Sequence, residues 1–378
     1  MSERFSLGRL MAVLAKEFVQ IRRDRLTFGM LVGIPLMQLT LFGYAINTDP
    51  KALPTAIRAA DHSIFTRDLV SALENSGYFA ILRRTASEAE AERLIAAGEV
   101  QFVVNIPDGF SRDLQRGLRP AVLVEADATD PAATSNALGA LAALERRALA
   151  RDLRGPLAAL DSDPSAFEFR VHRRYNPEGI TQYNIVPGLI GVVLTMTMVI
   201  MTALAVTRER ERGTMENLLA MPVRPIEVML GKILPYILIG YVQVVLILLA
   251  ALFLFDVPML GSMTLLSLTL VVFIAANLAV GFTFSTLARN QLQAMQMAFF
   301  FFLPSLLLSG FMFPFRGMPG WAQAIGELLP LTHFLRIVRG ILLKGNGWNE
   351  VMPETWPIAL FLLVASAVAL KRYRKTLD

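Results

Sequence analysis

The sequence predicts an α-helical polytopic membrane protein, with six transmembrane helices and an α/β extracytoplasmic domain between helices 1 and 2. Of its 378 residues, 54% are hydrophobic and only 18% are charged, which is too apolar for the surface of an ordinary soluble protein. Six runs contain no charged residue, and basic residues gather beside them. Between the first two runs lies one long segment of mixed polarity.

The six charge-free runs are each interpreted as a membrane span. They cover residues 26–48, 179–207, 233–255, 257–288, 290–315 and 355–370. A bilayer core of about 30 Å requires roughly 20 helical residues. The last run has only 16 residues. It is expected to span only if Trp356 lies at one interface and Lys371 and Arg372 extend to the other.

These runs divide the chain into five parts. Residues 1–25 are expected to form a cytoplasmic interfacial amphipathic helix, 26–48 transmembrane helix 1, 49–180 the extracytoplasmic α/β domain, 181–370 transmembrane helices 2 to 6, and 371–378 a cytoplasmic tail. Within 181–370, a basic loop covers residues 208–232. An external segment, 315–350, is interrupted by glycines, prolines and charges, which prevent a clean span.

The charge distribution predicts the orientation. The first 25 residues contain six Lys or Arg, the loop 208–232 five and the tail four. By the positive-inside rule these segments, and both termini, lie in the cytoplasm. Residues 47–184 carry 16 basic and 19 acidic residues, net −3, so the remainder carries +8 and the whole chain +5. The basic excess therefore follows topology and does not indicate a nucleic-acid partner.

The external segment alternates strand and helix patterns, which indicates an α/β domain. Expected strands are 55–60, 78–82, 100–106 and 121–125, and expected helices are 64–74, 87–97, 110–117 and 132–154. Ser87 and Glu90 form a capping-box pattern, and Gly98 is a helix-stop signal. The acidic cluster Glu125, Asp127 and Asp130 is interpreted as a solvated turn, with a cation site as the alternative.

Several kinds of chemistry have no pattern in this sequence. There is no cysteine, the three histidines are far apart, and no G-x-x-x-x-G-K-[ST] or G-x-S-x-G motif occurs. Ion-coupled transporters usually carry charged side chains inside their spans, and the six spans expected here have none in their interiors. We therefore expect no catalytic residue, no metal site and no cofactor bound by this chain, and a driving force supplied by a partner.

The loop after the second run has a distinctive pattern. Arginine and glutamate alternate up to Gly213, which breaks the helix. Thr214 can then cap a short helix with Met215, Leu218 and Leu219 on one face, which Pro222 ends. Such a helix at the membrane surface suits contact with another protein; the alternative is a simple connector.

This loop resembles that of the ABC-2 type permeases, the membrane subunits of bacterial ATP-binding-cassette exporters. The pattern E-R-x-x-G-T-x-E-x-L-L-x-x-P-V is carried by Glu209, Arg210, Gly213, Thr214, Glu216, Leu218, Leu219, Pro222 and Val223. Further matches are Pro225 with Gly231-Lys232, Ile106 to Ser111 followed by the turn Asp127 to Asp130, and Ser309-Gly310 to Pro314 leading to Pro330 to Phe334. The resemblance is closest to the drug-efflux branch with a large external domain. One departure is Ala128, which replaces the glycine expected in the turn after Asp127 and weakens any role for that turn.

The resemblance implies roles for these residues. The helix that contains Met215 would couple the chain to an ABC ATPase subunit, which binds ATP and Mg, and a second permease subunit would complete a homodimer or heterodimer. Residues 315–350, with Pro314, Pro330, Thr332, His333 and Phe334, would re-enter the outer leaflet. His333 is interpreted as a structural histidine at the interface, with a proton carrier as the alternative.

The resemblance also implies a location and an activity. The chain would lie in the bacterial inner membrane, with a periplasmic adaptor as a further expected partner, and would export a hydrophobic or amphipathic small molecule or drug from the cytoplasm or inner leaflet. Two other classes are alternatives. A membrane-anchored sensor would need an output domain, which the eight-residue tail does not contain. A membrane enzyme would need clustered His, Asp or Ser within the spans.

Overall fold

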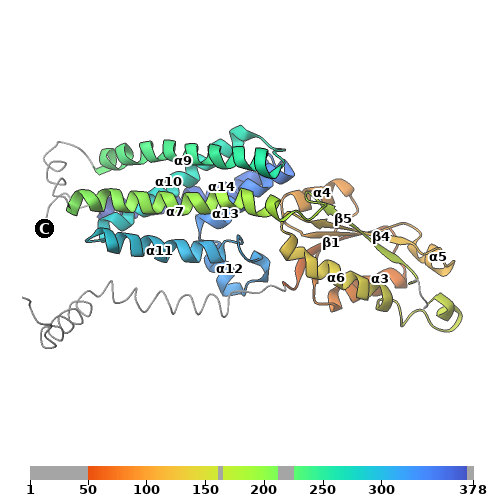
Figure 1. The fold of residues 1–378 in the computed structure, drawn as a ribbon. Helices are drawn as coiled ribbons and strands as arrows, with labels where there is room; N and C mark the ends of the chain where they lie inside the picture. Colours follow the sequence, from red (N-terminus) through yellow and green to blue (C-terminus); the bar gives the residue numbers. More distant parts are fainter. Residues whose placement is uncertain (1–49, 161–164, 212–224, 373–378) are drawn as a thin grey trace, which may run out of the picture.

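The computed structural model describes residues 50–160, 165–211 and 225–372. In these residues a bundle of long helices lies at one end and a domain built on a β-sheet at the other (Figure 1). Five of the described helices are long and apolar enough to cross a membrane. The predicted interfacial helix at 1–25, the predicted first span at 26–48 and tail residues 373–378 lie outside the described residues.

The sheet domain, residues 50–174, contains a mixed five-stranded sheet in the order β2-β1-β3-β4-β5. The strands are β1 Leu53–Ala59, β2 Phe79–Arg84, β3 Phe102–Ile106, β4 Ala121–Asp127 and β5 Glu168–Arg174. β1 pairs in parallel with β2 and β3, β3 pairs antiparallel with β4, and β4 pairs in parallel with β5. The first four lie close to the predicted strands. The sequence does not predict β5, because most of this edge strand is polar and exposed.

Helices cover the sheet and close its core. They are α3 Ile64–Asn75, α4 Glu88–Ala96, α5 Phe110–Gln115, α6 Pro131–Arg147 and the 3₁₀ helix η2 Gly155–Leu160. Phe102, Phe110 and Phe167 are fully buried between the layers. Gly98, with φ +74°, follows α4 as predicted. The predicted capping box does not form, because Ser87 makes no side-chain cap and Glu90 instead accepts a hydrogen bond from Thr85 Oγ1 at 2.5 Å.

The carboxylate of Asp61 joins the first turns of α3 and α5. One oxygen accepts from Ser63 N at 2.8 Å and Thr66 Oγ1 at 2.9 Å. The other accepts from the backbone N and Oγ of Ser111, at 2.9 and 2.7 Å. Burial alone would raise the pKa of Asp61, but these hydrogen bonds lower it well below its usual range. The family-like segment that ends at Ser111 therefore has a structural role within the sheet domain.

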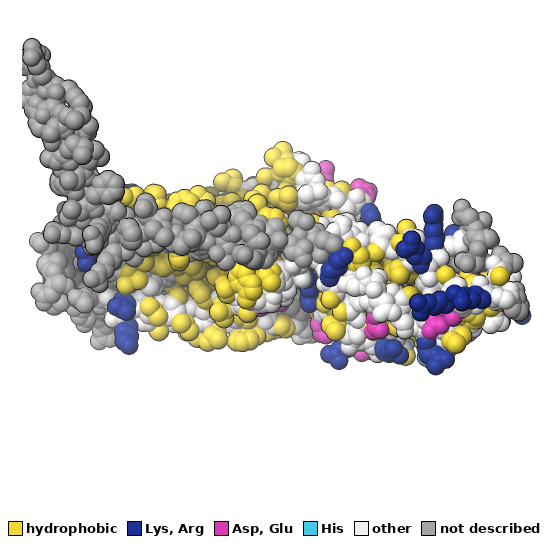
Figure 2. Space-filling model, turned by 90° about the horizontal axis from the view of Figure 1, so that it is seen from below, with side chains coloured by type: hydrophobic (Ala, Val, Ile, Leu, Met, Phe, Trp, Pro, Cys, Tyr) yellow, Lys and Arg dark blue, Asp and Glu magenta, His cyan; other side chains and the backbone are white. Residues whose placement is uncertain are grey.

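The long helices form a bundle around α10. They are α7 Thr181–Glu211, α9 Pro225–Phe255, α10 Met263–Leu287, α11 Gln291–Leu308 and α14 Trp348–Arg372. Most of α10 is buried against its neighbours, whereas α9 and α14 carry rows of exposed apolar side chains. Figure 2 shows hydrophobic side chains over the visible surface of the bundle, while charged side chains concentrate on the sheet domain. This division is the one expected for helices that face an apolar solvent.

The last helix is longer than the predicted sixth span. α14 has 25 residues, which correspond to about 37 Å at 1.5 Å per residue. It begins before the charge-free run at Thr355 because Glu350 and Glu354 are part of the helix. Glu350 accepts a hydrogen bond from Gly347 N, and Glu354 is paired with neighbouring side chains. The helix is therefore longer than the 16-residue run, since a charge inside a helix is tolerated when a partner is present.

We predict that the contact between α7 and α10 tolerates no side chain at Gly281. A Cβ there would lie 2.6 Å from Val199 O, on the backbone of the neighbouring helix. Gly281→Ala should therefore force the helices apart and lower the melting temperature of the detergent-solubilised protein, with a cost of about 1–3 kcal/mol.

Gly139→Ala is the matched control. Gly139 lies within α6, and a Cβ there meets nothing within 4 Å, so alanine should leave stability unchanged or raise it slightly. Equal melting temperatures for the Gly281 variant and the wild type would contradict the close packing of α7 on α10.

Candidate functional site at the junction of the two domains

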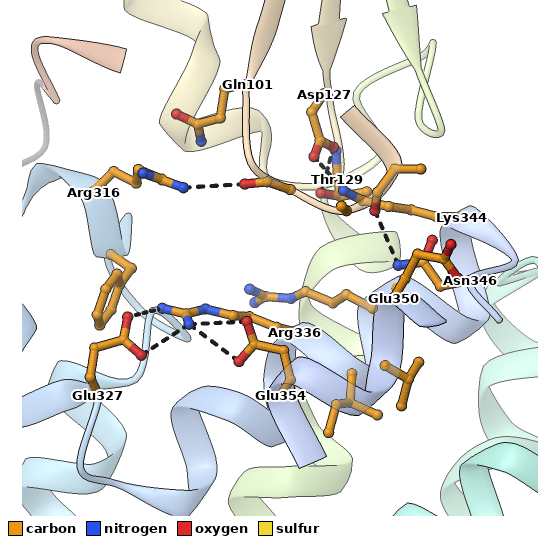
Figure 3. Close-up of a pocket in the computed structure, with 18 of the residues that line it drawn as sticks. Gln101, Asp127, Thr129, Arg316, Glu327, Arg336, Lys344, Asn346, Glu350 and Glu354 are labelled. Atoms are coloured by element: carbon orange, nitrogen blue, oxygen red, sulfur yellow. Dashed lines mark hydrogen bonds and ion pairs between the residues drawn. The ribbon is translucent and has the colours of Figure 1, made fainter. Parts of the chain in front are cut away.

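A series of short helices connects α11 to α14. The short-helix segment, residues 315–347, contains the 3₁₀ helix η3 Phe315–Gly317, α12 Gly320–Gly326, α13 Pro330–Arg339 and the π-helix η4 Gly340–Lys344. The glycines and prolines that exclude a span in the sequence do separate these elements. The segment meets the end of α4 and the turn after β4, at residues 127–130. We call this contact the junction (Figure 3).

The centre of the junction is an ion pair between Lys344 and Asp127. Lys344 Nζ lies 2.5 Å from Asp127 Oδ2, and the two side chains are only 8% and 9% exposed. Nζ also donates to Ile95 O at 3.2 Å and lies 5.2 Å from the centre of the Tyr175 ring. Burial and then Asp127 raise the pKa of Tyr175 to about 12, so the ring stays neutral. An ion pair this deeply buried leaves an uncompensated charge if either partner is removed.

Three donors from the short-helix segment bind the carboxyl end of α4. Lys344 donates to Ile95 O, Asn346 Nδ2 to Ala96 O at 3.1 Å, and Arg316 Nη2 to Gly98 O at 3.2 Å. The last carbonyls of a helix have no partner within the helix and carry a partial negative charge. Cationic and amide donors thus complete the end of α4 and hold the sheet domain on the bundle (Figure 3).

Asn184 and Arg339 connect α7 to the same junction. Arg339 donates to Asn184 Oδ1 at 3.0 Å and to Gly310 O at 3.2 Å. Asn184, in the first turn of α7, donates from Nδ2 to Thr129 O at 2.8 Å. The turn after β4, the start of α7 and α13 are therefore linked by side-chain hydrogen bonds in a buried region.

A second polar cluster surrounds His333. His333 Nδ1 lies 2.6 Å from Glu354 Oε2, and Nε2 lies 2.8 Å from Glu327 O. A carbonyl only accepts, so Nε2 carries a proton and a second proton is shared between Nδ1 and Glu354. Arg336 binds Glu327 at 2.6 Å and Glu354 at 3.3 Å. Because both ring nitrogens of this buried histidine are occupied, the geometry favours its structural interpretation.

The structure brings together the predicted residues of the external segment. Pro314 precedes η3, and Pro330 occupies the first turn of α13. Thr332 Oγ1 donates to Gly326 O at 2.7 Å, which closes the turn before α13. Phe334 stacks on Phe273 of α10, with ring centroids 4.1 Å apart. Phe334 therefore packs α13 on α10, and His333 links it to Glu354 of α14.

The predicted coupling residues are described only in part. Glu209 and Arg210 belong to the last turn of α7. Gly213, Thr214, Met215, Glu216, Leu218, Leu219 and Pro222 lie outside the described residues.

The acidic turn differs from its sequence interpretation. Glu125, Asp127 and Thr129 are buried, so this is not a solvated turn. Glu125 pairs with Arg174 at 2.6 Å, and Lys344 Nζ occupies the place that a bound cation would take beside Asp127. Within the described ranges, no group of three or more His, Asp or Glu is arranged to hold a metal ion. A lysine supplied by a distant part of the chain pairs with Asp127 instead.

Sequence reasoning does not identify Lys344, Asn346 or Asn184 as junction residues. The available signals are weak: one asparagine at the start of an apolar helix, and a Lys-Gly-Asn-Gly sequence after an amphipathic one. The junction encloses a polar cavity of about 280 Å³, lined by both acids and bases. Its charges are mostly paired with each other, which suits a fixed contact between the sheet domain and the short-helix segment.

Residues 25–371 match the family model described as ABC-2 family transporter protein. The chain belongs to this family. It is 31% identical to the probable multidrug ABC transporter permease YbhS of Escherichia coli K12 over 371 residues, 96% of this chain and 94% of the relative. It is 30% identical to the inner membrane transport permease YhhJ of the same strain, over 86% of each chain. It is 25% identical to ABC transporter G family member 20 of Dictyostelium discoideum, over 94% of this chain and 48% of that protein.

Membership of the ABC-2 family confirms the resemblance seen in the loop and in the external motifs. The match extends over nearly the whole chain, from before the predicted first span to the end of α14. Its bacterial relatives are named as permeases of ABC transporters. With five candidate spans in the described residues, this ABC-2 chain is a multi-pass membrane protein of the transport permease class.

We predict that the Lys344–Asp127 pair holds the sheet domain in place. Lys344→Met leaves Asp127 buried and unpaired, at a cost of about 3 kcal/mol. Hydrogen exchange of the β4 amides, which measures local opening, should then become roughly 100-fold faster.

The double variant Lys344→Met, Asp127→Asn removes both charges and should lose much less protection than the single variant. Arg119→Met, which breaks the exposed pair with Glu145, is the control and should change exchange little. Full protection in the Lys344 variant would show that the pair does not hold the domain.

Proposed function

We propose that the chain is the permease subunit of an ABC-2 exporter. It moves a hydrophobic or amphipathic small molecule, of the kind called a drug, out of the cytoplasm or the inner leaflet. ATP hydrolysis on a separate ABC ATPase subunit, which binds ATP and Mg, drives the movement. The names of the bacterial relatives, which are multidrug ABC transporter permeases, support this assignment.

The course of α7 carries the proposal. This helix has 31 residues, about 46 Å, and begins at Thr181 beside the junction. It ends at Glu211, at the end of the bundle away from the sheet domain, where α9 also begins (Figure 1). Residues 212–224, which carry most of the predicted coupling motif, therefore connect two helix ends on the face opposite the sheet domain. One continuous helix joins the proposed ATPase contact to the external side.

The charges support an orientation in which that face is cytoplasmic. Glu211 accepts a hydrogen bond from Gln291 N at 2.8 Å, so the basic turn at Arg289 lies beside the end of α7. Lys371 and Arg372, at the end of α14, lie at the same end of the bundle. The positive-inside rule then assigns the sheet domain to the periplasm. With the first span at 26–48, the chain would cross the bacterial inner membrane six times, and both of its termini would lie in the cytoplasm.

In this arrangement the chain works with partners. The coupling residues Glu209 to Pro222 contact the ATPase subunit, and a second permease subunit, identical or different, completes the transporter. The exposed apolar rows of α9 and α14 face lipid or that subunit. The short-helix segment would re-enter the outer leaflet, and the sheet domain would be free to contact a periplasmic adaptor.

The mechanism requires two arrangements of the bundle that the ATPase biases differently. Closure of the ATPase subunits displaces the segment after Glu211. Because α7 is continuous, its other end moves with it, and Asn184 carries the displacement to Arg339 and the turn after β4. Opening to the outside is thereby linked to the position of the sheet domain.

We predict the orientation from single cysteines in this cysteine-free chain. Ser63→Cys, in the sheet domain, should react with an impermeant maleimide added to intact cells whose outer membrane has been permeabilised. Thr214→Cys, in the coupling segment, should react only after the inner membrane is opened. Labelling of Thr214→Cys from outside would overturn the orientation.

We predict that Glu216→Arg and Gly213→Pro uncouple the permease from its ATPase. Charge reversal and a rigid proline both alter the surface that would contact the ATPase. Co-purification with the partner ATPase, and ATP hydrolysis by the pair, should each fall at least tenfold. Glu178→Arg, the same charge reversal at an exposed position near the sheet domain, is the control. Normal binding and hydrolysis by both coupling variants would refute the assignment.

A further inference from the structure

An apolar pocket of about 520 Å³ opens where the sheet domain meets the bundle, apart from the polar cavity of the junction. Its walls come from the start of α6, the first turns of α7 and the loop after α11. Eight of the eleven described residues that line it are apolar, among them Phe311, Met312 and Phe313. The volume lies within the range of roughly 300–1,000 Å³ that is typical of sites for drug-sized molecules.

The polar residues of this pocket lie together at its boundary with the sheet domain. They are Asp130, Thr181 and Asn184. The apolar side is formed in part by Ile185 and Leu189, which belong to the candidate membrane span that begins at Thr181. The pocket is therefore polar toward the sheet domain and apolar toward the depth of the span, which is the polarity of an amphiphile lying along a membrane interface.

Asp130 is the only acid that lines this pocket, and it has no ion-pair partner among the described residues. Its carboxylate caps α6 by accepting from Ala133 N at 3.4 Å. In the described ranges, no Lys, Arg or His nitrogen lies within 4 Å of it. Arg339, whose charge acts on Asp130, directs its hydrogen bonds to Asn184 and Gly310. Burial raises the pKa of Asp130, and the charge of Arg339 opposes this only in part, so a second cation beside the carboxylate would favour its charged form.

We propose that this pocket binds a cationic amphiphile, with the Asp130 carboxylate facing the positive group and Phe311, Met312 and Phe313 contacting the apolar body. Aromatic faces also attract cations, which adds to the preference. A neutral or anionic amphiphile would leave the carboxylate without an ion-pair partner in direct contact. The proposal rests on the proposed export function and narrows it, since it gives the class of substrate and a place where the substrate is held near the outer end of α7.

Binding can be tested on the permease alone, without its ATPase. The reporter is Thr181→Cys in the otherwise cysteine-free chain, reconstituted in nanodiscs of zwitterionic lipid and labelled with a maleimide. Rhodamine 6G, a lipophilic cation, should slow labelling at least fivefold. Nile red, which is neutral and of similar size, should protect only at roughly tenfold higher concentration.

Asp130→Asn should weaken protection by rhodamine 6G roughly tenfold and leave protection by Nile red unchanged. Asparagine is also a good N-cap residue, so α6 should keep its cap. Asp108→Asn, at an exposed acid outside the pocket, is the control and should change neither probe.

Three results would overturn the proposal. Equal protection by both probes, unaffected by Asp130→Asn, would show apolar binding without charge recognition. A reporter that is labelled equally fast with and without either probe would show that the pocket binds neither. A reporter that is not labelled without ligand would show that another part of the chain fills the pocket. The assay contains no ATPase, so it does not depend on whether the coupling variants uncouple the permease. A failure of the proposed function and a failure of the proposed pocket can therefore be told apart.

Discussion

The structure depends on one requirement, that the polar groups buried between a sheet domain and an apolar helical bundle be satisfied within the chain. The carboxyl end of α4 and the acidic turn after β4 both present oxygens to the bundle. Lys344 Nζ binds both: it lies 2.5 Å from Asp127 Oδ2 and donates a hydrogen bond to Ile95 O at 3.2 Å. Without Lys344, a buried carbonyl would lose a donor and the Asp127 carboxylate would lose its counter-charge, at several kcal/mol in total. The placement of the sheet domain, and with it the start of α7, follows from this contact.

The sequence predicts the elements better than it predicts their contacts. Spans follow from hydropathy and strands from alternation, because both patterns are local. The sequence does not predict β5 because this strand has few apolar residues. It does not predict the start of α14 because Glu350 and Glu354 interrupt the apolar run. The contacts of the junction are not predicted for a different reason. Lys344 and Asp127 are 217 residues apart, and no local pattern relates a lysine at the end of a helix to an acid at the end of a strand.

The family-like motifs of the sheet domain and of the short-helix segment have mostly structural roles here. Ser111 anchors α5 to Asp61, Thr332 closes the turn before α13, and Phe334 packs on α10. Sequence reasoning finds these residues because they belong to a recognisable pattern, yet it cannot state what each contacts. The partners are a carboxylate in another loop, a backbone carbonyl and an aromatic ring, and only the fold brings them together.

The two helices α7 and α11 are fastened to each other at both ends. At one end Glu211 accepts hydrogen bonds from the backbone and side chain of Gln291, and at the other Arg339 binds both Asn184 of α7 and Gly310 beyond α11. Neither helix can slide along the other without breaking these bonds. Because α7 and α11 are held together at both ends, a displacement of one helix along its axis would have to move the other with it.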